Sequence, residues 1–432
     1  MQTLYGGQQK RSTRDIGYII YYSVLLLITF ILSKPHAAYG ELVRYVYLGA
    51  VVLPLFFNKS YVVFALTLFF GISQTSFVSL MPTASYYMLC IVVVLCFMQV
   101  KIKRDIVPVF IWILYVLCVE LLNMTPHLEC VICGIATLLL SCYVGTKQDL
   151  SKIGVAFCLI SLVLGLLFVI FFNEFAEQFF MKGNEEVERS GWINANIFGG
   201  VIGCGMVSSV LMLVNPQDFT LSKLVKSLCL CCVILSTIVL ILNASRGALI
   251  ASILASLILL FCSRIKRTTL VLILLGCVLL LTILYSAGYF ELLELRVAGE
   301  NNNTETAGGR TEIWAEKFEA FGALPAYTQL IGVGYYRCVD LGIYFDTHND
   351  FVTALCAYGF IGLLSFVIFS IAPIFIASRR YKLTVLGLVV FLAIEGFVLS
   401  PIFRGYFVFF VFYLMIIKFA AMTRRQQSLG SR

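Results

Sequence analysis

Long apolar runs constrain this chain more than any other feature of its sequence. Each run holds about 20 residues with few charges, which is the length that a helix needs to cross the hydrocarbon core of a membrane. Hydrophobic residues make up 60% of the 432 residues and charged residues only 12%, whereas a soluble domain carries about 25% charged residues. Backbone groups in lipid must be satisfied internally, and the runs are too long for barrel strands. They therefore predict an all-α polytopic membrane protein.

The runs predict about fourteen transmembrane helices, or about twelve if two short runs do not cross. We expect one membrane domain, 1–432, whose first run is a transmembrane helix and not a cleaved signal peptide, because no small-residue cleavage site follows it. Its expected parts are N-terminal helices at 16–173, an acidic outer loop at 174–191, central helices at 192–289, a large outer loop at 290–349, C-terminal helices at 350–421 and a cytoplasmic tail at 422–432. The predicted spans are 16–33, 38–57, 60–80, 83–100, 105–123, 128–146, 152–173, 192–214, 222–242, 246–263, 269–289, 350–378, 383–400 and 404–421.

Lysine and arginine sort to one side of these spans. With the N-terminus placed inside, the inner side collects 21 lysine and arginine residues against four acids, and the outer side collects ten against 19 acids. Short cytoplasmic loops of membrane proteins carry such an excess of positive charge. The pattern predicts that both termini are cytoplasmic. The four inner acids are Asp15, Asp105, Asp149 and Asp218.

The outer loop at 290–349 is too long to be a simple turn. After Gly308 and Gly309 its sequence predicts a short amphipathic helix whose apolar face holds Trp314, Phe318 and Phe321. We expect this helix to lie against the membrane or to cap the helical bundle.

Three arginines stand out on the acidic outer side. Arg246 begins a span, Arg310 follows a Gly-Gly pair at the start of the amphipathic helix, and Arg189 follows an acidic stretch. Guanidinium groups match the oxygens of phosphate, and helix N-termini also favour anions, so an anion site is one interpretation. The alternatives are a snorkelling anchor for Arg246 and ion pairs with loop acids for Arg310 and Arg189.

Among the three histidines, only His348 has a supporting context. It ends the large outer loop, directly before Asn349, Asp350 and the next span. A neutral imidazole can accept a proton from an attacking hydroxyl. Asn349 or Asp350 would fix the tautomer of the ring or would cap the following helix.

Most of the 15 cysteines lie inside apolar runs, where they pack as small hydrophobic side chains. The closely spaced pair Cys130 and Cys133 has no fourth metal ligand in sight, and packing is favoured over a metal site. Two acids, Glu120 and Glu395, lie towards the outer ends of spans. One interpretation is that they contact a substrate. The other is that each carboxylate is satisfied by a water-filled cavity or a local hydrogen bond.

Six short outer motifs follow one another between about Arg189 and Leu364. They are Arg189-x-Gly191 with Asn194-Ala195-Asn196, Ser245-Arg246-Gly247, Gly309-Arg310 with Trp314, Gly332-Val333-Gly334, His348-Asn349-Asp350-Phe351 and Tyr358-Gly359-Phe360-Ile361-Gly362-Leu363. Each motif alone is weak, but their order and spacing resemble the bacterial O-antigen polymerase and O-antigen ligase family of membrane glycosyltransferases. One departure is Ala195, where related proteins often have proline.

The resemblance implies a GT-C-like fold in the bacterial inner membrane and a periplasmic active site. There a glycan would be transferred from undecaprenyl diphosphate without a metal cofactor, and the sequence has no Asp-x-Asp metal signature. His348 would be the base that activates the acceptor hydroxyl. The diphosphate would be bound by Arg246, Arg310 and Arg189, with Asn349, Asp350, Trp314 and Asn196 in supporting roles.

The implied partners are a lipid-linked oligosaccharide donor, a glycan acceptor, membrane lipids and a chain-length regulator, and nucleic acid is not among them. A polymerase would use another lipid-linked repeat unit as acceptor, whereas a ligase would use lipid A–core oligosaccharide. The number of spans and the divergent N-terminal half favour a polymerase. A protein oligosaccharyltransferase is a third interpretation. A lipid-linked glycan transporter is an alternative from another class, but few charged residues near the bilayer midplane support it.

Overall fold

The computed structural model describes most of the chain from residue 104 onward. The predicted spans before residue 101 and the outer loop at 174–191 lie outside the described residues, except for three positions near residue 20. The described residues are 20, 21, 24, 104–124, 128–142, 144–170, 195–219, 221–243, 245–263, 265, 267–288, 290, 310–335, 338 and 347–430.

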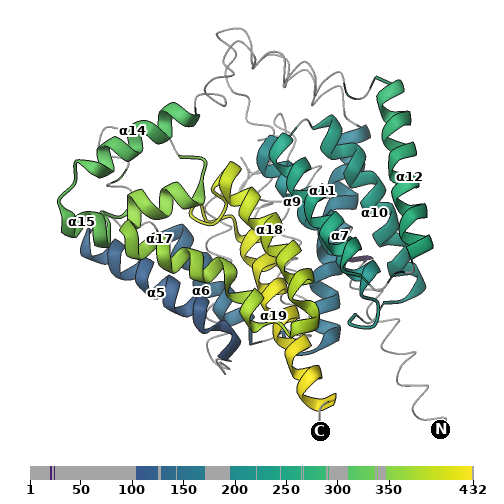
Figure 1. The fold of residues 1–432 in the computed structure, drawn as a ribbon, viewed down its shortest axis with the longest axis horizontal. Coiled ribbons are helices and arrows are strands. Elements are labelled where there is room, and N and C mark those ends of the chain that lie inside the picture. The colour runs from purple at the N-terminus through teal and green to yellow at the C-terminus, as the bar shows by residue number, and fades with distance from the viewer. Residues whose placement is uncertain are drawn as a thin grey trace.

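Every element in these ranges is a helix (Figure 1). Ten helices match predicted spans five to fourteen in order, and two short helices, α14 and α15, lie in the large outer loop. The elements are η3 (Arg104–Ile106), α5 (Val107–Leu122), α6 (Leu128–Leu140), α7 (Lys147–Ile170), α9 (Ala195–Val214), α10 (Lys223–Leu242), α11 (Arg246–Phe261), α12 (Arg267–Ser286), α14 (Arg310–Gly322), α15 (Ala326–Ile331), α17 (Asp350–Ile376), η6 (Arg379–Tyr381), α18 (Lys382–Leu399) and α19 (Phe407–Gly430).

Seven of the described helices are long and apolar enough to cross a membrane. They are α5, α7, α9, α10, α17, α18 and α19, while α6 and α11 are apolar but shorter. The prediction of an all-helical, multi-pass membrane protein is therefore confirmed. The count of fourteen stays a prediction, because the first four spans lie outside the described residues.

Helix α19 forms the centre of the bundle. Each residue from 407 to 417 is at most 1% exposed, as expected for a helix that is apolar on all sides. Aromatic rings join it to its neighbours: Tyr413 of α19 stacks on Phe369 of α17 at 4.2 Å between centroids, and Phe369 stacks on Trp112 of α5 at 4.5 Å. These contacts hold α5, α17 and α19 together inside the bundle.

Two ion pairs lie at one end of the bundle. Lys418 Nζ of α19 lies 3.0 Å from Asp105 Oδ2 of η3, and both side chains are buried. Lys147 Nζ of α7 lies 3.6 Å from Asp218 Oδ1, which follows α9. Each pair joins an acid of the predicted inner side to a nearby lysine.

The two ion pairs share the same end, because Phe219 stacks on Phe419 at 5.9 Å between ring centroids. Asp149 lies at the start of α7, close to Lys147, where its carboxylate accepts hydrogen bonds from the Gly145 and Thr146 backbone N–H groups. Three of the four acids that charge sorting assigns to the inner side thus meet at one end of the bundle. The fourth acid lies outside the described residues.

The predicted span at 350–378 corresponds to α17, but this helix contains a break that was not predicted. Gly359 has φ +70° and ψ −172°, which divides α17 into a short first segment, 350–358, and a longer second segment, 360–376. In Figure 1 the two segments run in clearly different directions. The second segment is about 26 Å long at 1.5 Å per residue, which is close to the thickness of the hydrocarbon core. Hydropathy does not reveal this break, because the sequence is apolar on both sides of it.

The amphipathic helix predicted after Gly309 is confirmed as α14. Phe318 shares the predicted apolar face with Trp314 and Phe321 by its spacing and is 45% exposed, while Lys317 is only 3% exposed. Trp314, Lys317 and Phe321 share one helical face at spacings of three and four residues.

Candidate active site

The C-terminal end of α18, together with the turn that follows it, lies at the centre of the candidate site. We call residues 397–404 the α18 end. It contacts the starts of α11, α14 and α17, and these three starts carry Arg246, Arg310 and His348. Three candidate residues far apart in the sequence therefore lie within one helical turn of residues that contact the same short segment.

The motif Ser245-Arg246-Gly247 joins the start of α11 to two neighbouring helices. Ser245 Oγ donates to Asn196 Oδ1 of α9 at 3.2 Å. A Cβ atom built on Gly247 would lie 2.6 Å from Val398 Cγ1 of the α18 end, so only glycine permits this close approach. Serine and glycine thus fix the start of α11, and Arg246 between them is exposed.

Trp314 connects the amphipathic helix to the site. Its indole N–H donates to the Thr347 carbonyl at 2.7 Å, directly before His348. Its ring packs edge-on against Phe397 of the α18 end, 5.3 Å between centroids. Arg310 is the first residue of α14 and lies one helical turn before Trp314, so it shares this face. Arg310 is partly buried.

Asn349 and Asp350 have structural roles that differ from each other. The Asn349 side chain caps α17 by accepting from the N–H groups of Phe351 at 2.8 Å and Val352 at 3.1 Å. The Asp350 carboxylate is fully buried and accepts from Ser400 Oγ at 3.0 Å and from the N–H groups of the next turn. Capping was one of the two roles predicted for this pair, and Asn349 confirms it. Asp350 instead holds the turn after α18 in place.

His348 lies in the left-handed backbone region, with φ +48°. This conformation is unfavourable for most residues, and strain of this kind gathers at functional sites. Hydrogen bonds on both sides stabilise it: Trp314 binds the carbonyl before His348, and Thr347 Oγ1 donates to the Asn349 carbonyl at 2.9 Å. The backbone therefore orients the imidazole, which stays partly exposed.

Arg404 was not among the residues singled out in the sequence. Its Nη2 atom lies 3.5 Å from His348 Nδ1, and its Nη1 atom lies 3.4 Å from the Tyr406 hydroxyl oxygen. The turn that carries Arg404 is fixed by Asp350 and by Phe403, whose ring stacks on Tyr358 at 5.1 Å. Only one sequence signal pointed to Arg404, namely that it is one of ten lysines and arginines on the predicted outer side.

The glycine motifs at 332–334 and 358–363 pack against each other and hold the first segment of α17 in place. The N–H groups of Val333 and Gly334 both lie 2.9 Å from the Ala357 carbonyl. A Cβ atom built on Gly332 would lie 2.4 Å from Tyr358 Cα. The motif at 332–334 therefore packs on the end of the short α17 segment and fixes the bend at Gly359.

The buried carboxylate of Glu120 completes this support. Its Oε1 atom accepts from the Tyr335 N–H and from the Tyr358 hydroxyl, each at 2.8 Å. Local hydrogen bonds therefore satisfy the Glu120 carboxylate, which was one of the two interpretations of this residue. Glu395 is also buried and lies against Gly200 of α9, and its Oε1 atom has no hydrogen-bond partner among the described residues.

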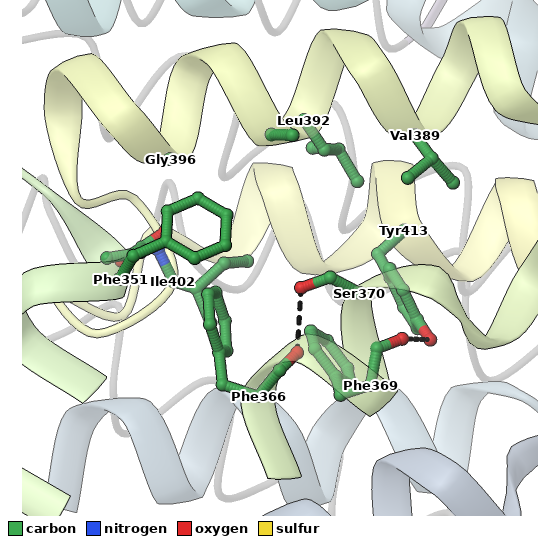
Figure 2. Close-up of a pocket in the computed structure, with 11 residues that line it drawn as sticks. Phe351, Phe366, Phe369, Ser370, Val389, Leu392, Gly396, Ile402 and Tyr413 are labelled. Carbon is green, nitrogen blue, oxygen red and sulfur yellow. Dashed lines mark hydrogen bonds between the residues drawn. The ribbon is translucent and has the colours of Figure 1, made fainter. Parts of the chain in front are cut away.

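A small hollow lies beside Asp350, between α17, α18 and α19 (Figure 2). Its volume is about 20 Å³, which is enough for roughly one water molecule. It is too small for an isoprenoid chain, so it is not the lateral opening that a lipid-linked donor requires. It is lined by Asp350, Phe351, Phe366, Phe369, Ser370, Val389, Leu392, Ala393, Gly396, Ile402 and Tyr413.

The remaining candidates divide into two groups. Asn196 lies at the site through its hydrogen bond to Ser245, whereas Arg189 lies outside the described residues. Cys130 and Cys133 are buried and form no disulfide within the described part of the chain. Among the described residues, no group of three or more His, Cys, Asp and Glu side chains is arranged to hold a metal ion.

The described helices define a multi-pass membrane protein in which Arg246, Arg310 and His348 each lie within four residues of a contact with the α18 end. Residues 231–367 match a family model described as O-antigen ligase. This match supports membership of the O-antigen polymerase and ligase family and confirms the resemblance predicted from the motifs. The matched segment contains Arg246, Arg310, Trp314 and His348, but neither Arg189 nor Arg404. No curated protein matches the chain.

Proposed function

We propose that this protein transfers a glycan from undecaprenyl diphosphate to an acceptor hydroxyl at the α18 end. The observation that carries the proposal is the contact of this one segment with the starts of α11, α14 and α17. An imidazole and several guanidinium groups then flank the same space. These are the groups that a metal-free displacement of a diphosphate needs.

In the proposed reaction His348 accepts the proton of the acceptor hydroxyl. The hydroxyl oxygen forms a bond to the anomeric carbon of the donor sugar, and the bond from that carbon to the diphosphate oxygen breaks. A positioned base contributes typically 10²–10⁴-fold to such a rate. Asn349 and Trp314 hold His348 in position through the backbone on its two sides.

The leaving diphosphate gains negative charge as the bond breaks. Arg246 and Arg310, with Arg189 as a third group, would bind its oxygens through charge-assisted hydrogen bonds. Each such contact contributes about 1.5–3 kcal/mol. Because arginines provide this charge, we expect a metal chelator to leave the rate unchanged.

The carrier chain would lie on the lipid-facing side of α17 and α18. Several apolar side chains of these two helices are not covered by other parts of the protein. One of them is Phe397 of the α18 end, whose ring also contacts Trp314. Others on this surface include Phe360, Leu364, Ile368, Phe375 and Leu383. The site would face the periplasm, opposite the end that carries the two ion pairs, with both termini in the cytoplasm of a bacterial inner membrane.

We propose a polymerase, which extends a surface polysaccharide by using another lipid-linked repeat unit as acceptor. A chain-length regulator would then be a partner. The second candidate is an O-antigen ligase, because the matching family model carries that description. The two functions share the donor and the base and differ only in the acceptor.

The test uses purified protein in lipid nanodiscs with a lipid-linked repeat unit as donor and with ethylenediaminetetraacetate present. Growth of the glycan without any other acceptor would support the polymerase, and transfer only after addition of lipid A–core would support the ligase. No transfer to either acceptor would contradict the proposed function.

The matched variant for this test is His348→Asn. Asparagine tolerates the left-handed conformation of residue 348 better than most residues, so the backbone should keep its path. We expect wild-type expression and thermal stability but a loss of transfer of at least about 100-fold. Full activity of this variant would remove His348 from the mechanism.

A further inference from the structure

We propose that Arg404 occupies the lone pair of His348 Nδ1 until a donor binds, and that the carrier diphosphate then draws Arg404 away and exposes the base. The inference rests on the proposed function and adds a positioning residue to it. It also gives the reaction an order, because the base becomes available only when the diphosphate is in place.

The chemistry of the two side chains fixes the direction of their contact. A guanidinium group has five N–H donors and no acceptor. His348 Nδ1, which lies 3.5 Å from Arg404 Nη2, must therefore be the accepting atom. The ring proton of the neutral imidazole then lies on Nε2, and the lone pair that could accept a proton from the substrate is covered by Arg404.

The contact is also weak enough to be exchanged. At 3.5 Å it is long for a hydrogen bond, and the contact of Arg404 Nη1 with the Tyr406 hydroxyl, at 3.4 Å, is long as well. Both of these partners are uncharged. Diphosphate oxygens would offer charge-assisted and bidentate contacts at about 2.7–2.9 Å. The arriving diphosphate is therefore a better partner for Arg404 than the imidazole is.

The backbone next to Arg404 is held in place, so the proposed exchange moves its side chain and not its turn. The backbone of its turn is held by Asp350, which accepts from the N–H groups of Ile402 at 3.3 Å and Phe403 at 3.2 Å. The Phe403 ring is fixed in addition by its stack on Tyr358. Arg404 thus extends from a fixed backbone and lies adjacent to the predicted base.

The balanced step has three parts. Arg404 moves its hydrogen bond from Nδ1 to a diphosphate oxygen of the bound donor. The acceptor hydroxyl then gives its proton to Nδ1 while its oxygen bonds to the anomeric carbon. The carbon–oxygen bond to the diphosphate breaks, and Arg404 stabilises the charge on the leaving group.

The tautomer can be measured directly, because the chain has only three histidines. Nitrogen-15 NMR of histidine-labelled protein in nanodiscs resolves the protonation of each ring nitrogen, and the spectrum of His348→Asn assigns the His348 signals by subtraction. We expect the free protein to carry the proton on Nε2 and to have a bare, hydrogen-bonded Nδ1. Undecaprenyl diphosphate should shift the Nδ1 signal, whereas undecaprenol, which lacks the diphosphate, should not. A proton on Nδ1 in the free protein, or an Nδ1 signal unaffected by the diphosphate, would overturn the inference.

Variants of Arg404 provide a second readout. Arg404, from the turn after α18, contacts the His348 ring. Asp350 lies two residues later in α17, and Arg310 and Arg246 lie at the starts of α14 and α11. Removing the cation in Arg404→Gln stabilises the protonated ring, so the acidic limb of the pH–rate profile should move to higher pH and the rate should fall at least about 10-fold. Arg404→Lys keeps the charge and should keep the limb in place.

Arg380→Gln, at the other end of the bundle, is the control and should match the wild type. A slow Arg404→Gln enzyme with an unmoved acidic limb would show a purely structural role and contradict the inference. The NMR result does not depend on catalysis. A wild-type protein with the expected tautomer but no transfer to any acceptor would therefore contradict the proposed function and leave the Arg404–His348 contact standing.

Discussion

His348 illustrates how backbone conformation and side-chain chemistry are joined in this protein. A left-handed residue that is not glycine needs hydrogen bonds on both sides to stay in place. Trp314 binds the Thr347 carbonyl before His348. After it, Thr347 Oγ1 binds the Asn349 carbonyl and the Asn349 side chain caps α17. The supporting residues therefore act on the position of His348 and not on its chemistry.

Trp314→Phe tests this positioning at the scale of one hydrogen bond. Phenylalanine keeps a ring to pack on Phe397 but loses the indole N–H that binds the Thr347 carbonyl. We expect a loss of about 1 kcal/mol in the free energy of unfolding and a several-fold lower kcat with little change in KM. Denaturant unfolding and steady-state transfer rates measure the two effects. Unchanged kcat would show that the bond to Thr347 does not orient the base.

At the scale of elements, the bend in α17 decides where the site lies. A straight helix from Asp350 to Ile376 would be about 40 Å long and would carry His348 away from the α18 end. Gly359 allows the chain to change direction, and the motif at 332–334 and Glu120 hold the short first segment against α5.

Gly359→Ala should break this arrangement. The residue has φ +70°, and a Cβ atom there would lie 2.6 Å from the carbonyl oxygens of Gln329 and Leu330. Both are backbone atoms, so the conflict is relieved only by moving α15 or straightening α17. We expect a destabilisation of at least about 1–3 kcal/mol and loss of transfer.

Gly276→Ala is the matched control for that variant. Gly276 lies inside α12, and a Cβ atom there would meet no atom within 4 Å. Alanine favours a helix over glycine by about 0.5–1 kcal/mol, so this variant should be at least as stable as the wild type. Equal stability of Gly359→Ala and Gly276→Ala, in the same unfolding assay, would contradict the role given to the bend.

At the scale of the whole molecule, the two ends of the bundle differ in charge and in proposed location. Arg246 and Arg380 are both exposed, one at each end. In intact cells whose outer membrane has been made permeable, a membrane-impermeant maleimide should label Arg246→Cys. It should label Arg380→Cys only after the inner membrane is opened, with the wild-type protein giving the cysteine background. Labelling of both from the same side would contradict the topology.

Much of this arrangement could be predicted from the sequence, because charge and apolar length are properties of the chain itself. The ten later spans, the start of α14 at Arg310 and the sorting of Asp105 and Asp218 to one end needed no tertiary information. Arg404 could not be found this way, since its importance depends on a contact with His348, 56 residues earlier. The break at Gly359 could not be predicted from hydropathy either, because the sequence is apolar on both sides of it.

In the proposed site, Arg246 and Arg310 bind the carrier diphosphate, and His348 accepts the proton of the acceptor hydroxyl. The most direct measurement compares undecaprenyl diphosphate binding and glycan transfer in Arg246→Gln, Arg310→Gln and His348→Asn under identical conditions. We predict that both arginine variants bind the carrier at least about 10-fold more weakly, while His348→Asn binds it as the wild type does and transfers nothing. Wild-type carrier affinity in both arginine variants, or normal transfer by His348→Asn, would contradict the claim.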